Sequence, residues 1–408
     1  MGYSGNVIKG ISWMSGFRML TRVLSFVKMA VLARALTPSQ FGIFGIATLV
    51  LAFLEMIAET GINIILIQSR KEIDEYINSA WVVSIIRGIF ISSCIIILTP
   101  FITSFFNTPN ASDILFLISI VPFIRGFINP SEIKLQKDLK FHYEFWFRSS
   151  IFTFDAIVSV ILVVLTHSVY SLVWGLIAGA VVEVVLSFIL MRPIPRFHIR
   201  KDYLSEIFHK GKWVTAYGFF NYIAQKGDSL IVGKVMGASA LGLYGMAYNI
   251  STLPISEITD VVSKVIFPVY AKIAEDRQRL KSAFIKSTLV IAMLTMAMGT
   301  VLFLFPSQII LIVLGEKWLD AVPVLRVLVV YGVLRAVSGS ASALFLGVEK
   351  QRYVTNMTFL RFAGLAITVY PLVQIFGLVG AGYSALISVV VEIPVIAYYV
   401  MKVFKNKR

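Results

Sequence analysis

The chain has 408 residues, of which 58% are hydrophobic and only 14% are charged, whereas soluble domains carry about 25% charged residues. This composition excludes a soluble globular protein and is typical of a polytopic membrane protein. The formal net charge is +15, but the sequence contains no soluble basic module of the kind that binds nucleic acid.

Apolar stretches of about 20 residues, long enough to cross a hydrocarbon core of about 30 Å, follow one another along the chain. Helices are favoured because an irregular chain exposed to lipid leaves its backbone groups unpaired. The sequence therefore predicts an all-α protein with about twelve transmembrane helices, at 8–32, 41–67, 79–104, 112–131, 147–166, 169–191, 213–236, 241–267, 284–305, 321–346, 353–373 and 378–401.

The first predicted helix carries Arg18, Arg22 and Lys28 within its apolar stretch. These charges interrupt the compact apolar core of a signal peptide, so we expect the segment to remain as a helix. Arg18 and Arg22 are four residues apart and share one helix face. They either pair with the second helix, which carries Glu55 and Glu59 at the same spacing, or form a cationic patch in a central cavity, where guanidinium groups suit phosphate oxygens.

Residues 33–47, ARALTPSQFGIFGIA, return two hundred positions later as residues 233–247, GKVMGASALGLYGMA. An offset of half the chain length indicates gene duplication and two six-helix lobes. An even number of helices separates the repeats, so the lobes share one orientation about a pseudo-twofold axis along the membrane normal. Residues 37–40 and 237–240 predict equivalent turns at which one helix ends and the next begins.

Between the repeats, Arg192-Pro193-Ile194-Pro195 ends the preceding helix, because proline cannot continue it. Residues 192–212 form either an interfacial amphipathic helix or an ordinary basic linker. The predicted lobes are 1–191 and 213–408. Connections rich in Lys and Arg alternate with nearly uncharged ones, which places the basic loops and both chain termini in the cytoplasm.

Ionisable groups at membrane depth usually face a cavity or a partner, and so are candidate functional residues. Asp260 and Lys264 lie on one helix face and could pair with each other. Cys94 is the single cysteine and the four histidines lack ligand spacing, so we expect no metal site and no cofactor beyond an H⁺ or Na⁺ gradient. The candidate cations for substrate binding are Arg18, Arg22, Lys28, Lys226, Arg335 and Arg361, and the candidate acids for coupling or ion pairing are Glu55, Glu59, Asp155, Asp228, Glu257 and Asp260.

Four segments resemble Wzx-type oligosaccharide flippases, the polysaccharide transporters of the multidrug/oligosaccharidyl-lipid/polysaccharide (MOP) exporter superfamily. They are the repeat at 33–47, IVGKVMGASALGLYGMAYNISTLPISE at 231–257, Phe267-Pro268 before a charged loop, and LGEKWLDAVPVLRVL at 314–328. The similarity covers nearly the whole chain, and we expect no counterpart of the two further C-terminal helices of some members. The motifs are mainly structural and identify no catalytic residue, so an enzyme is not expected.

The resemblance implies two parallel six-helix lobes around a central cavity in the bacterial cytoplasmic (inner) membrane. The implied function is to move undecaprenyl-diphosphate-linked oligosaccharide repeat units from the cytoplasmic to the outer leaflet for surface polysaccharide synthesis. Alternating access between the lobes would carry the substrate. The expected partners are this lipid-linked glycan, membrane lipids and other polysaccharide assembly proteins, without nucleic acid.

Three alternatives stay open. A cation-coupled drug antiporter of the same superfamily would concentrate acids in its cavity, whereas the first helix here offers basic residues. A peptidoglycan-precursor flippase is closer in substrate but usually has additional helices. A membrane polymerase, ligase or glycosyltransferase needs an outer loop that presents acids or arginines to a glycan, and the longest one here offers Glu316, Lys317 and Asp320. The sugar repeat is not specified, because selectivity would rest on weak polar contacts such as Asn63, Asn221, Tyr222 and Asn249.

Overall fold

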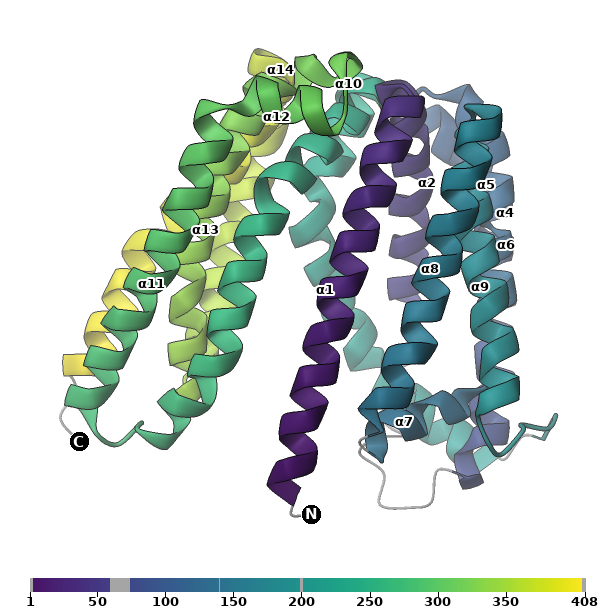
Figure 1. Ribbon diagram of the computed structural model, residues 1–408, viewed down its shortest axis with the longest axis horizontal. Coiled ribbons are helices and arrows are strands. Elements are labelled where there is room, and N and C mark those ends of the chain that lie inside the picture. Colours follow the sequence, from purple (N-terminus) through teal and green to yellow (C-terminus); the bar gives the residue numbers. More distant parts are fainter. Residues whose placement is uncertain (1–2, 59–73, 139, 199–200, 406–408) are drawn as a thin grey trace. The chain divides into compact units, whose positions relative to one another are not determined.

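The computed structural model describes residues 3–58, 74–138, 140–198 and 201–405, and the regular secondary structure of this part of the chain is helical, without a strand (Figure 1). The longer helices are α1 (Tyr3–Ala35), α2 (Pro38–Ile57), α4 (Asp74–Phe105), α8 (Phe141–Thr166), α9 (Tyr170–Leu190), α10 (Lys201–Lys272), α11 (Arg277–Leu304), α13 (Val322–Gly347) and α14 (Gln351–Lys405). The short ones are η1 (Pro109–Ala111), α5 (Ser112–Ile118), α6 (Ile120–Arg125), η2 (Pro130–Glu132), α7 (Ile133–Lys137), α12 (Pro306–Val313) and η3 (Glu316–Ala321).

The predicted number of membrane crossings agrees with these helices. Within the described residues, eight helices are long and apolar enough to cross a membrane, and the bent pair Pro109–Arg125 and Pro130–Lys137 would make a ninth. Two of the eight, α10 and α14, are each divided by a glycine with non-helical backbone angles, at Gly237 and Gly377. With α1 added and each divided helix counted as two, six crossing lengths lie on either side of residue 200.

The two repeated turns are built differently. After α1, Thr37 caps α2 reciprocally, since its side chain accepts from Gln40 N at 3.3 Å while Gln40 Oε1 accepts from Thr37 N at 2.8 Å. Pro38 occupies the first helical turn, where no N–H is needed. In the second repeat, Gly237 adopts φ 82° and ψ −176°, which only glycine reaches without strain. Both predicted helix boundaries are confirmed.

One expectation about local structure was wrong. The predicted helix at 112–131 is broken after Arg125, where residues 126–129 leave the helix and the segments Pro109–Arg125 and Pro130–Lys137 are bent by 66° to each other. Pro130 disfavours helical angles at the residue before it, and Asn129 is accordingly extended, with φ −73° and ψ 114°. The connection between the predicted helices 284–305 and 321–346 contains two short helices: α12 starts at Pro306 and buries Ile310, and η3 follows it.

Between α9 and α10 the chain is irregular as far as residue 198. From residue 201 to 236 the backbone is continuously helical, so no separate linker helix is seen. The side chains of residues 201–217 lie outside the described part, and their amphipathic character stays a prediction. The predicted lobes also stay a prediction, while contacts divide the chain into two compact units within α10, Met1–Ile223 and Ala224–Arg408.

Each unit has its own helix packing. In the first, α8 packs on α1 and α9, and α6 packs on α4 and α9. A Cβ at Gly88 would lie 2.8 Å from Gly126 Cα, so glycine permits the close approach of α4 and α6. In the second, α13 packs on α11 and α14 around a core that includes Tyr270, Leu344 and Phe345.

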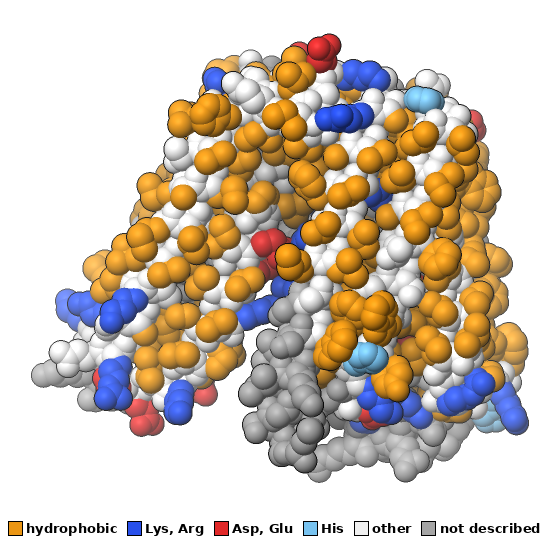
Figure 2. Space-filling view, viewed as in Figure 1, with side chains coloured by type: hydrophobic (Ala, Val, Ile, Leu, Met, Phe, Trp, Pro, Cys, Tyr) orange, Lys and Arg blue, Asp and Glu red, His pale blue; other side chains and the backbone are white. Residues whose placement is uncertain are grey.

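Surface chemistry agrees with a membrane environment. Large apolar side chains such as Phe101, Leu165 and Ile367 are at least 70% exposed, and Figure 2 shows such side chains along the helix flanks. Most Lys and Arg side chains in that view gather, in each unit, at the end that holds the chain terminus. Apolar flanks with a basic end are typical of a helical bundle that spans a bilayer.

Candidate functional site

An ion pair joins α1 to α8 in the first unit. Lys28 Nζ lies 2.7 Å and 2.8 Å from the two carboxylate oxygens of Asp155, and both side chains are 16% exposed. Ser159 Oγ, one turn further along α8, donates to Asp155 Oδ1 at 3.3 Å. Of the predicted cations, Lys28 is therefore held by a carboxylate of its own unit.

A second group of charges joins α2, α6 and α9. Arg125 Nε lies 3.1 Å from Glu183 Oε2, and Arg125 Nη1 lies 3.8 Å from Glu55 Oε1. Arg87 of α4 donates to the main-chain oxygen of Glu55 at 3.2 Å. Interhelical pairing was the favoured interpretation for the glutamates, and Glu55 takes part in it, although with α6. Glu59 lies outside the described residues.

Arg18 and Arg22 lie on a different face of α1 from the one that packs on α8. Trp13 stacks edge-on against His142 and Phe145 of α8 at 4.6 Å and 5.2 Å between ring centroids. At about 100° per residue, Arg18 and Arg22 stand about 140° and 180° around the helix from Trp13. Both side chains are exposed. The arginine pair therefore projects from the side of α1 that α8 leaves uncovered.

In the second unit, the buried carboxylate of Asp228 lies at one end of a row of three tyrosines. Tyr244 Oη donates to Asp228 Oδ2 at 2.8 Å, while the backbone N–H and hydroxyl of Ser229 approach Oδ1 at 2.6 Å and 3.2 Å. Asp228 is 6% exposed. The Tyr248 ring lies 6.2 Å from that of Tyr244 and 6.3 Å from that of Tyr331, measured between centroids. Asp228 is thus satisfied as a carboxylate.

The cations of α13 and α14 also have partners. Arg335 donates to Tyr331 Oη, and its guanidinium lies 5.7 Å from the centre of the same ring. Arg361 Nη1 lies 3.6 Å from Glu392 Oε2, and the Glu392 side chain is 3% exposed. The predicted cations Arg335 and Arg361 are therefore both engaged within their unit.

The remaining candidates are placed as follows. Lys226 is exposed on α10 and Glu257 is half-buried. Asp260 and Lys264 are exposed, and among the described residues they form no ion pair with each other. Tyr222, a predicted sugar contact, is 8% exposed and donates to Leu49 O at 2.6 Å. Of the other predicted sugar contacts, Asn249 is exposed, and the side chains of Asn63 and Asn221 lie outside the described part.

Sequence reasoning missed the groups that hold the candidates in place. Glu183 and Glu392 are visible as charges in apolar helices, but no helical spacing links them to Arg125 or Arg361. The sequence held one indication of Tyr244. It occupies the position of Phe44 in the first repeat, so both repeats have an aromatic ring there and only the second adds a hydroxyl. The structure adds these residues to the candidate site by distance alone.

The chain is similar to proteins of polysaccharide biosynthesis along nearly its whole length. It is 26% identical over 401 residues to an uncharacterized membrane protein of the cps region of Klebsiella pneumoniae, covering 97% of this chain and 82% of that protein. It is 24% identical over 408 residues to the lipopolysaccharide biosynthesis protein WzxC of Escherichia coli K12, covering 98% and 82%.

Two solved structures share the fold. An inward closed conformation of the lipid II flippase MurJ has a TM-score of 0.76 at 15% identity, covering 97% of this chain and 89% of that one. An inward-facing MATE family transporter of the MOP superfamily has a TM-score of 0.70 at 16% identity, covering 97% and 98%. The predicted fold class is confirmed, and the polysaccharide biosynthesis protein model matches residues 31–323. The chain belongs to the polysaccharide biosynthesis protein family, with the MOP-type fold that its sequence motifs predicted.

Proposed function

We propose that this protein flips undecaprenyl-diphosphate-linked oligosaccharide repeat units from the cytoplasmic to the outer leaflet during surface polysaccharide synthesis. The family match and the relationship to WzxC support the pathway. The fold shared with MurJ and a MATE transporter supports alternating access. The prenyl chain stays in lipid along the apolar helix flanks, and the diphosphate and glycan pass through the interior.

The observation that carries the substrate assignment is the exposed arginine pair on α1. Lys28, Arg335 and Arg361 are each held by a partner in their own unit. Arg18 and Arg22 stand one turn apart, both exposed, on the side of α1 away from α8. Side chains at this spacing are about 5–6 Å apart at Cβ, so two guanidinium forks can hold neighbouring phosphate groups. We assign the diphosphate to this pair.

Membrane orientation follows from the charged ends. The N-terminus and α7, which carries Lys134 and Lys137, lie at one end of the first unit (Figure 1). The α10–α11 turn and the C-terminus lie together at one end of the second. With these basic ends in the cytoplasm of a bacterium, both termini are cytoplasmic and the capped turn at Thr37 faces outward.

The test is the double substitution R18A/R22A, assayed for flipping of lipid-linked oligosaccharide in proteoliposomes and for surface polysaccharide in cells. Losing two charge-assisted contacts of about 1.5–3 kcal/mol each predicts at least a tenfold fall in flipping. The variant R18K/R22K keeps both positive charges but loses the planar guanidinium groups. Its flipping rate should lie between the rates of the wild type and of R18A/R22A. R326A, which removes an exposed arginine of α13, is the matched control. Flipping by R18A/R22A at the wild-type rate and protein level would contradict the assignment.

Coupling to an ion gradient is the second part of the proposal. Among the candidate acids that the structure describes, Asp228 is the most buried, and it is held by Tyr244 and Ser229. We expect one of the two ion gradients, proton or sodium, to drive flipping, so that dissipating this gradient in the vesicles lowers the flipping rate. Dissipating the other gradient should leave the rate unchanged. If neither treatment changes the rate, transport is driven by the substrate gradient alone.

A further inference from the structure

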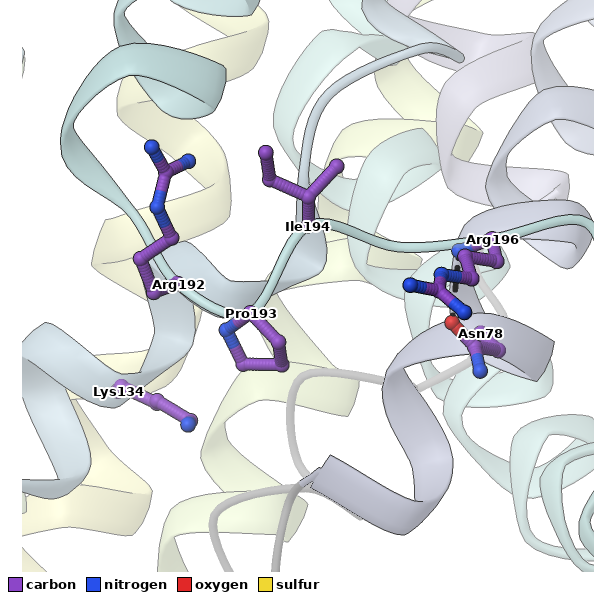
Figure 3. A pocket seen from close by; sticks show the side chains of 6 residues that line it. All are labelled: Asn78, Lys134, Arg192, Pro193, Ile194 and Arg196. Atoms are coloured by element: carbon purple, nitrogen blue, oxygen red, sulfur yellow. Dashed lines mark hydrogen bonds between the residues drawn. The ribbon is translucent and has the colours of Figure 1, made fainter.

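A cavity of about 930 Å³ lies at the basic end of the first unit, away from the residues assigned to transport. Figure 3 shows the side chains that line it, which come from the start of α4, from α7 and from the irregular segment after α9. The lining residues are Asn78, Lys134, Arg192, Pro193, Ile194 and Arg196. Of these six residues, which are the lining that the structure describes, three are cationic and none is acidic, so this part of the lining favours an anion.

The segment that supplies four of these six lining residues is fixed at two points. The carbonyl oxygen of Pro193 accepts from Ser131 Oγ at 2.8 Å and from Asn129 Nδ2 at 3.2 Å. The backbone N–H of Arg196 donates to Asn78 Oδ1 at 2.7 Å. Asn129 and Ser131 are buried. The cavity wall is therefore preorganised, and a ligand need not order it on binding.

Two of the cations point toward the same space. In Figure 3, Lys134 and Arg196 extend toward each other from opposite sides of Pro193, while the Arg192 guanidinium points the other way. Arg192 Nη1 donates to the carbonyl oxygen of Phe188 at 2.9 Å, which uses one of its five N–H groups and fixes the side chain at the end of α9. Arg196 is exposed and keeps its planar fork for a ligand.

Apolar side chains adjoin the cations. Ile194 is 49% exposed, and Phe197 is 75% exposed with its ring 4.6 Å from that of Trp81. Leu190 and Ile189, at the end of α9, are 57% and 62% exposed. Cations bordered by exposed aliphatic and aromatic groups are typical of the headgroup level of a bilayer. A soluble phosphate compound would use the cations but leave these apolar groups in water.

We propose that this cavity binds the phosphate of an anionic phospholipid headgroup from the cytoplasmic leaflet, with Lys134 and Arg196 on the phosphate oxygens. Ile194 and Phe197 contact the adjoining acyl chains. The bound lipid stabilises the junction of α4, α7 and α9 in the first unit. Because the site uses none of the residues assigned to the transported substrate, it is a second ligand site, occupied by the membrane itself.

The test measures lipid binding to the purified full-length protein in detergent, without transport substrate. Thermal unfolding is followed while short-chain phosphatidylglycerol is added, with phosphatidylcholine, glycerol phosphate and inorganic phosphate in parallel. A ligand of the folded state raises the unfolding temperature in a concentration-dependent way. We expect phosphatidylglycerol to do so, to lose effect as salt screens the charges, and to exceed the three other compounds.

The variant K134Q/R196Q should weaken phosphatidylglycerol binding about tenfold or more, with unfolding unchanged in the absence of lipid. K137Q/K140Q removes two charges from the same end without altering the lining and should bind like the wild type. Equal stabilisation by inorganic phosphate would show that the site takes free phosphate and would overturn the lipid assignment. Unchanged phosphatidylglycerol affinity in K134Q/R196Q, or equal affinity for phosphatidylcholine, would overturn the site.

Discussion

Replacing Lys28 by methionine should destabilise the protein strongly, because it leaves the Asp155 carboxylate without its cation. Lys28 Nζ contacts both oxygens of Asp155, and each side chain is only 16% exposed. The Ser159 hydroxyl at 3.3 Å would be the remaining donor. Breaking a buried pair by removing one partner costs about 3–5 kcal/mol, whereas exposed pairs contribute about 1 kcal/mol or less. The slight exposure here favours the lower end, about 3 kcal/mol.

The measurement is a double-mutant cycle on unfolding in mixed micelles. K28M and D155L each remove one charge, and the double variant K28M/D155L removes both and should recover most of the loss. If K28M costs less than about 1 kcal/mol and the coupling is near zero, the pair does not support the fold. A K28M variant that keeps wild-type stability but no longer flips substrate would show that Lys28 acts in transport, and would refute the structural interpretation.

Two further substitutions test local features. G237A should lower the free energy of unfolding by about 1–3 kcal/mol, because the φ of 82° at Gly237 is strained for any residue with a Cβ, although nothing lies within 4 Å of where that atom would be. G245A has equally open space and ordinary helical angles. By the same unfolding measurement, it should be neutral or slightly stabilising. Y244F should cost about 1–2 kcal/mol, because a buried carboxylate loses a donor, whereas Y383F, at a side chain 38% exposed, should leave stability unchanged. Equal effects within either pair would contradict the reasoning.

Local features of the fold were predictable because their causes are local. A capping box needs Thr37 and Gln40 three residues apart, and the sharp second turn needs a glycine, so both boundaries can be recognised from the sequence. The break inside the predicted helix at 112–131 also has a local cause, Pro130, which apolar length alone concealed. Length and hydropathy predict that a segment crosses the membrane, but not whether it does so as one helix.

The charge partners were not predictable, because each is set by packing between distant segments. Lys28 and Asp155 are 127 residues apart, and Arg125 and Glu183 are 58 apart. A charge in an apolar helix indicates that a partner or a cavity exists, without indicating which. For this reason Lys28 and Arg18 look alike in the sequence, as cations of one helix. Only the packing of α8 shows that Lys28 faces Asp155 and that Arg18 does not face α8.

Equivalent positions of the two repeats differ between residues that pack the fold and residues that we propose for substrate binding. At an offset of 200, Arg18 and Arg22 correspond to Gly218 and Tyr222. A Cβ at Gly218 would lie 2.9 Å from Met56 Cγ, and Tyr222 donates to Leu49 O. The equivalent positions of α10 therefore pack against α2, where an arginine would have neither space nor water. In the first repeat the same positions are exposed on α1, so the cationic pair that we propose for the diphosphate stands in only one of the two copies.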